Sequence, residues 1–95
     1  MLKVVATLIA KPDKIEETKA ALSSLVPPTQ AEEGCISYEL FQSADDPTEF
    51  VTIEEWVDEA AMGEHMASDH IAAALAVVPD ILAAAPKITP MVPVA

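Results

Sequence analysis

The chain has 95 residues, of which 52% are hydrophobic, and its formal net charge is −11 with lysine as the sole basic residue type besides histidine. This charge repels phosphate backbones and anionic lipid, and the lack of arginine removes the usual bidentate anchor for phosphate or carboxylate ligands. We therefore expect a single domain over residues 1–95 that binds neither nucleic acid nor membrane. A small apolar or phenolic molecule suits its composition better.

The cysteine content and the N-terminal segment indicate in which cellular compartment the protein is expected. One cysteine, Cys35, excludes an internal disulfide and a cysteine-based zinc cluster. The first residues lack the apolar run and cleavage site of a signal peptide, and no stretch approaches the roughly 20 apolar residues of a spanning helix. We expect a cytoplasmic protein.

The first third of the chain predicts a strand followed by a helix. Residues 2–10 form a short apolar, β-branched run, typical of a strand that is buried on both faces. Lys11-Pro12-Asp13 ends this strand and starts a helix, and Pro27-Pro28 is expected to end that helix. Residues 29–34 read as a polar connection. The apolar positions at helical spacing are Ile15, Thr18, Leu22, Leu25 and Val26.

The middle of the chain predicts a β-hairpin. Residues 35–43 and 49–57 read as strands, joined by a segment rich in turn-forming residues at 44–48.

Two helical stretches and a final strand follow. Asp58 is a suitable N-cap for a helix through about Ala67, and Ser68 can cap a second stretch. Pro79 is expected to restart a short helical turn that runs through residue 85. Residues 87–94 form a last extended segment, whose prolines confine it to a sheet edge or a bulge.

The resulting β-α-β-β-α-β order predicts a ferredoxin-like α+β fold, with an antiparallel sheet and helices on one face. Neither face of the hairpin strands is cleanly polar, although an exposed antiparallel sheet usually has one solvated face. We therefore expect the second face to be covered by another copy of the chain, in a symmetric homodimer packed through the sheet faces.

The residues best suited to chemistry gather between positions 38 and 70. Strand alternation places Phe50, Thr52, Glu54 and Trp56 on one face, while the face of Tyr38 depends on a register that the sequence leaves open. His65 lies four residues after Ala61 and is expected to face the sheet. These side chains predict a small apolar pocket with a few convergent polar groups.

Each of these residues also has a structural explanation. Trp56 could be a core or interface aromatic, and Tyr38 could place its ring in the core and its hydroxyl at the rim. Glu54 could pair with a lysine or accept backbone donors. His65 could be a satisfied interior or surface histidine, and His70 could only support a helix start. Their joint occurrence favours a functional site.

Metal binding is the weaker interpretation. His65 and His70 are five residues apart and do not share a helix face as an i, i+4 pair would. A helix break after Ala67 could bring them together, with Glu54 or Glu64 completing a site, but nothing in the sequence enforces this. We predict no metal ligands, and the two glycines exclude a glycine-rich phosphate loop.

Four segments resemble the antibiotic biosynthesis monooxygenase family. These segments are residues 33–40 (EGCISYEL), 46–50 (DPTEF), 54–56 (EEW) and 65–70 (HMASDH). The resemblance implies a dimeric α+β barrel with a cavity between sheet and helices. It also implies a monooxygenase that oxidises a small quinol or aromatic phenol with dioxygen and needs no cofactor.

The resemblance assigns roles to the pocket residues. His65 would be the general base, Glu54 would orient it or the substrate hydroxyl, and Tyr38 would donate a hydrogen bond. The expected substrate-binding residues are Trp56, Phe50, Thr52 and His70, the last at the pocket mouth.

Two alternatives on the same scaffold remain open: a proton-transfer isomerase and a non-catalytic dimeric protein that binds a small ligand. The haem-degrading branch of the family is disfavoured. It uses an asparagine on the first strand, a tryptophan near position 65 and a histidine about ten positions later. This chain has no asparagine on that strand, and it has His65 and Leu75 at the other two positions.

Overall fold

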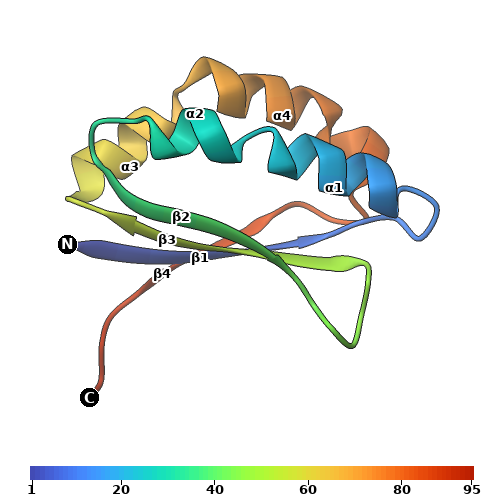
Figure 1. Ribbon diagram of the computed structural model, residues 1–95, viewed down its shortest axis with the longest axis horizontal. Helices are drawn as coiled ribbons and strands as arrows, with labels where there is room; N and C mark the ends of the chain where they lie inside the picture. Colours follow the sequence, from blue (N-terminus) through green and yellow to red (C-terminus); the bar gives the residue numbers. More distant parts are fainter.

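Four strands form one antiparallel sheet with helices over one face in the computed structural model, which describes residues 1–95. The sheet order is β2-β3-β1-β4, and Figure 1 shows the helices on one side of it and the opposite side uncovered. This arrangement confirms the predicted ferredoxin-like α+β class. The strands are β1 (Leu2–Ile9), β2 (Cys35–Gln42), β3 (Glu49–Trp56) and β4 (Lys87–Met91); the helices are α1 (Ile15–Ser23), α2 (Val26–Gln30), α3 (Glu59–Met66) and α4 (Asp69–Ile81).

The inner face of β3 is buried at every second residue. Phe50, Thr52, Glu54 and Trp56 are all buried, as the predicted alternation requires. On the neighbouring β1, small or aliphatic residues lie opposite these positions, with Ala6 paired to Thr52 and Val4 to Glu54. The polar side chains of β3 therefore point toward the layer of helices.

A β-bulge sets the register of β2, which the sequence left open. Cys35 pairs with Trp56 but Ser37 pairs with Glu55, so Ile36 is an extra residue in this strand. After the bulge, Tyr38 lies opposite Glu54 on the inner face and is buried. Without the bulge, the alternation from Cys35 would direct Tyr38 to the outer face.

Two side-chain caps place the bend between α3 and α4. Asp58 accepts a hydrogen bond from the Ala61 amide at 2.8 Å, and Ser68 accepts one from the Ile71 amide at 3.4 Å. The Ser68 hydroxyl also donates to the carbonyl of His65 at 2.6 Å. The two helices therefore begin where the sequence predicted, with a short break between Met66 and Asp69.

Two expectations about proline were wrong. Pro27 and Pro28 do not end a helix but open α2, because proline needs no amide partner in a first turn. Pro79 does not restart a helix but lies inside α4, which continues to Ile81. The buried Ile81 and Leu82 anchor this last turn in the core, and the Ile81 carbonyl accepts from the Lys11 amide at 2.8 Å.

The core lies between the helices and the sheet, and the outer sheet face retains apolar side chains. Phe41 on β2 is among the exposed large hydrophobic residues, and Val5 and Ile53 of the central strands are partly buried. None of the helices is both long enough and apolar enough to traverse a lipid bilayer.

Gly34 allows the segment before β2 to pass close to α3. A Cβ atom at position 34 would overlap the Cβ of Ala61 and approach the Ala61 Cα to 3.4 Å. A backbone hydrogen bond also joins the two segments here, because the Gly34 carbonyl accepts from the Val57 amide at 2.9 Å. The absence of a side chain therefore sets the distance between this segment and α3.

We predict that Gly34→Ala lowers the free energy of unfolding by about 1–3 kcal/mol, because the added methyl group forces α3 away from the chain. Gly63→Ala is the matched control, since Gly63 lies in α3 with nothing near its missing Cβ. The control should be neutral or stabilising by up to about 1 kcal/mol. Urea unfolding at one fixed protein concentration measures both, and equal midpoints would contradict the close approach.

Candidate functional site

An apolar pocket lies between the inner sheet face and the helices. It has a cavity volume of about 70 Å³ and is lined by 20 residues, of which 16 are hydrophobic. The polar side-chain atoms in its wall come from Tyr38, Thr52, Glu54 and His65. This distribution, apolar walls with few polar groups, is typical of a small-molecule site.

Glu54 is a buried carboxylate held by side chains of its own strand. One oxygen, Oε2, accepts from the Thr52 hydroxyl at 2.6 Å, and Oε1 accepts from the Trp56 indole N–H at 3.0 Å. The residue is 3% exposed, so these two bonds compensate part of its desolvation. Neither a lysine nor a backbone amide is its partner, contrary to the structural alternatives considered for it.

His65 is buried within a cluster of aromatic rings and is bound by a carboxylate. Its ring centroid lies 4.6 Å from that of Trp56 and 5.7 Å from that of Tyr38. Its Nδ1 lies 2.7 Å from Oε2 of Glu32. A carboxylate at this position favours the tautomer that carries the proton on Nδ1, which leaves Nε2 free to accept a proton.

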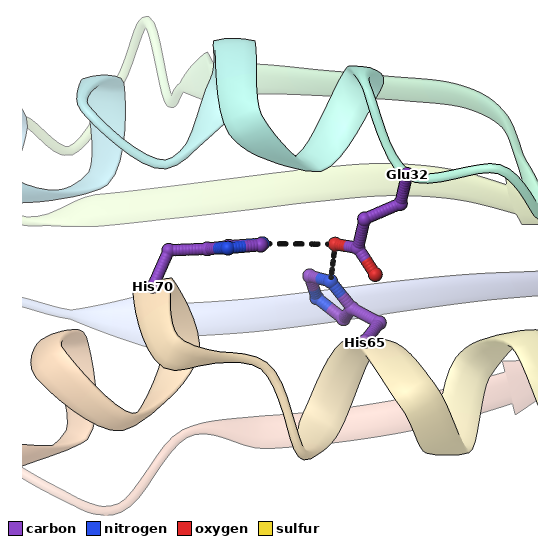
Figure 2. Close-up of side chains that lie close together, drawn as sticks. All are labelled: Glu32, His65 and His70. Atoms are coloured by element: carbon purple, nitrogen blue, oxygen red, sulfur yellow. Dashed lines mark hydrogen bonds and ion pairs between the residues drawn. The ribbon is translucent and has the colours of Figure 1, made fainter.

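His70 binds the same carboxylate oxygen from the other side. Its Nε2 lies 2.9 Å from Oε2 of Glu32, and its ring centroid is 5.9 Å from that of His65 (Figure 2). The His70 side chain is 22% exposed, whereas that of His65 is 3% exposed. The cluster of Glu32, His65 and His70 therefore reaches from the pocket wall to solvent.

Glu32 was missed by the sequence reasoning, which treated residues 29–34 as a polar connection. The segment that follows α2 holds it in place, with its amide donating to the Thr29 carbonyl at 3.0 Å and its carbonyl accepting from the Cys35 amide at 3.0 Å. The close approach of Gly34 to α3 then brings its carboxylate to the histidines. No spacing in the sequence indicates this contact. The segment that resembles the family begins only at residue 33, directly after Glu32.

The structure brings together some of the predicted site residues and separates others. Tyr38, Thr52, Glu54 and His65 line the pocket, whereas Phe50 and Trp56 are buried on the same sheet face but do not line it. His70 does not line it either and instead contacts Glu32. The carboxylate that joins the two histidines is Glu32, and not Glu54 or Glu64, the latter being exposed.

Burial raises the pKa of the Tyr38 hydroxyl above its ordinary value. Desolvation is the largest cause, and the negative charge of Glu54 is the next. Tyr38 therefore stays protonated at neutral pH and can donate a hydrogen bond into the pocket.

The protein is therefore of the α+β class, with a ferredoxin-like sheet, helices on one face of it, and an apolar pocket whose wall includes a carboxylate-bound histidine. The model of the family "Antibiotic biosynthesis monooxygenase" matches residues 1–77. The chain belongs to this family.

Similar proteins support this assignment. YcnE of Bacillus subtilis, whose name assigns it provisionally to the monooxygenases, is 40% identical over 70 residues, which are 74% of either protein. Among solved structures, PA3566 of Pseudomonas aeruginosa is 33% identical with a TM-score of 0.93, covering 99% of this chain and 94% of that one. A structure described as an antibiotic biosynthesis monooxygenase is 34% identical with a TM-score of 0.92, and all of both chains is covered.

We predict that the phenolate band of Tyr38 near 295 nm is absent at pH 10 in the folded protein, where an exposed tyrosine would be half ionised. The chain has one tyrosine, so this absorbance reports Tyr38 alone. Because its pKa is raised on folding, Tyr38 stabilises the fold below about pH 10, and this contribution is lost as the pH rises further.

The urea-unfolded chain is the reference and should titrate near pH 10. Glu54→Gln removes the negative charge beside the hydroxyl, so its phenolate should appear at lower pH than in the wild type. A folded protein that titrates like the unfolded chain would contradict the burial of Tyr38.

Proposed function

We propose that the protein is a cofactor-independent monooxygenase that oxidises a small quinol or aromatic phenol with dioxygen. One observation supports this proposal most directly. A buried imidazole, His65, lines an apolar pocket while its Nδ1 is bound by the carboxylate of Glu32. This is the arrangement in which a carboxylate orients a general base.

His65 acts as the base that takes the phenolic proton. With Nδ1–H donated to Glu32, the Nε2 atom is the ring nitrogen available to a ligand in the pocket. The imidazolium formed by proton uptake is stabilised by the Glu32 carboxylate at 2.7 Å.

The deprotonated substrate supplies all of the electrons. For a quinol, loss of four electrons and entry of one oxygen atom gives a hydroxyquinone, while the second oxygen atom of O₂ leaves as water. The proton that His65 takes up is returned when that water forms. The protein therefore needs to bind the substrate, deprotonate it and exclude bulk water.

The other pocket residues position the substrate and shape the cavity. Tyr38, kept protonated by burial, donates a hydrogen bond to a substrate oxygen. Glu54 fixes Thr52 and Trp56 through its two hydrogen bonds, and Trp56 in turn packs against the base. Phe50 packs in the core cluster that contains pocket-lining residues such as Leu8 and Ile71, and His70 contacts Glu32 from the solvent side.

We also propose a homodimer that packs through the uncovered sheet faces. The outer positions of the two central strands carry Val5 and Ile53, which are paired in the sheet, and Phe41 on β2 is 47% exposed. These residues form an apolar group between charged positions of the same face, such as Lys3, Glu39 and Glu55, and such a group is typical of a surface that a partner covers. A second copy covers it with a symmetric interface.

We predict oxygen uptake with a suitable quinol in the presence of a metal chelator. His65→Ala should lower kcat by about 10²-fold or more, the usual contribution of a general base. Glu32→Gln should lower kcat at least about tenfold, because it removes the charge that stabilises the imidazolium. An oxygen electrode and product chromatography measure both.

Glu33→Gln is the matched control, since it removes one charge from the neighbouring, exposed position. Equal loss in both glutamate variants would contradict the role of Glu32. Proton exchange of the ligand without oxygen uptake would favour an isomerase instead. Ligand binding with neither process would favour a non-catalytic binding protein.

We predict a solution mass of twice the 10.1 kDa chain. Ile53→Lys should give a folded monomer at micromolar concentration, because it places a charge at the centre of the apolar face. Val94→Lys adds the same charge on the exposed C-terminal segment and should remain dimeric. Light scattering separates the outcomes, and a dimeric Ile53→Lys variant would contradict packing through the sheets.

A further inference from the structure

We propose that Glu32, His65 and His70 form a binding site for a divalent first-row transition-metal ion. The ligand atoms are a carboxylate oxygen and two imidazole nitrogens, and they all lie within 4.8 Å of one another. They come from three separate segments, namely the chain after α2, helix α3 and the start of helix α4 (Figure 2). The fold rather than local sequence therefore assembles the set.

The three ligand atoms already converge on one point. Nδ1 of His65 and Nε2 of His70 approach the same carboxylate oxygen at 2.7 and 2.9 Å. Zinc binds nitrogen and oxygen ligands at about 2.0–2.2 Å, so an ion between the three atoms requires a side-chain rotation of Glu32 and small movements of the rings. When the ion binds, the proton on each of these nitrogens moves to the other nitrogen of the same ring, so both imidazoles stay neutral.

The surroundings of the site favour a cation. Glu32 and Glu54 are two carboxylates close to this end of the pocket, and no lysine pairs with either of them. The two histidines are therefore the only partially basic groups that face Glu32. A divalent ion would neutralise this negative charge at low cost in desolvation.

The site is both held in place and accessible. Ser68 bonds the His65 carbonyl and the Ile71 amide, which fixes the bend between α3 and α4 and thus the distance between the two imidazoles. The side chains of Glu32 and His70 are 17% and 22% exposed, which gives an ion a route from solvent. His65 closes the inner side.

A ligand set of two imidazoles and one carboxylate favours some metal ions over others. Imidazole nitrogen suits Zn²⁺, Co²⁺ and similar ions, whereas Mg²⁺ and Ca²⁺ prefer sites composed of oxygen ligands. Three protein ligands also leave at least one coordination position open. We therefore expect Zn²⁺ to bind and Mg²⁺ not to compete.

Metal binding has a consequence that rests on the proposed function. An ion on Nδ1 of His65 displaces the proton from that atom, so the neutral ring carries its proton on Nε2. The ring then cannot accept a proton from a ligand in the pocket. Bound Zn²⁺ should therefore inhibit oxygen uptake reversibly, and a chelator should restore it.

The test is a titration of the full-length, chelator-treated protein with Zn²⁺ by isothermal calorimetry at neutral pH. We expect one ion per chain, with a weaker affinity by about 100-fold or more in Glu32→Gln and in His70→Ala, because each loses a ligand. Glu33→Gln is the control and should bind within about twofold of the wild type. Quenching of Trp56 fluorescence by Co²⁺ gives a second measure, since the indole packs against His65.

Far-UV circular dichroism confirms that each variant is folded. Unchanged Zn²⁺ affinity in either ligand variant, or equal affinity for Mg²⁺ in the wild type, would overturn the metal site. These binding results need no substrate, so they decide the proposal even if no turnover is found. Zinc that binds as expected without inhibiting oxygen uptake would leave the metal site intact and contradict His65 as the base.

Discussion

The contact on which the site depends is a single carboxylate oxygen of Glu32 that accepts from two imidazoles. This oxygen fixes the tautomer of the buried His65 and ties the start of α4 to the chain before β2. A buried imidazole without such a partner would leave a ring nitrogen unsatisfied in an apolar layer. The base and the metal site that we propose both rest on this contact, because the same carboxylate contacts His65 and completes a set of three ligand atoms with the two histidines.

The other carboxylate of the site, Glu54, is buried and is supported in a different way. Glu54 is bound by Thr52 and Trp56, both on its own strand at a separation of two residues. These bonds form whenever β3 is extended with this face inward, so they need no distant part of the chain. One acid of the site is therefore supported locally and the other, Glu32, is supported only by the tertiary structure.

The small size of the chain explains why one sheet face forms the pocket while the other face is uncovered. The helices and the inner face of the sheet enclose the cavity, and no helix of residues 1–95 covers the outer face (Figure 1). A domain of this length buries a modest share of its surface, so a second copy would supply apolar burial that the single chain lacks. The pocket and the dimer that we propose use opposite faces of the same sheet.

The sequence by itself determined the fold class, the inward face of β3 and the two helix caps, because alternation and capping are local properties that depend on a few neighbouring residues. It did not determine the inward position of Tyr38, since a one-residue bulge at Ile36 reverses the alternation. The predictions that Pro27 ends a helix and that Pro79 restarts one were wrong, because the effect of a proline depends on the packing of the turn that contains it. Only the tertiary structure placed Glu32 between the two histidines, because these residues are distant in the sequence: Glu32 is 33 residues from His65 and 38 from His70.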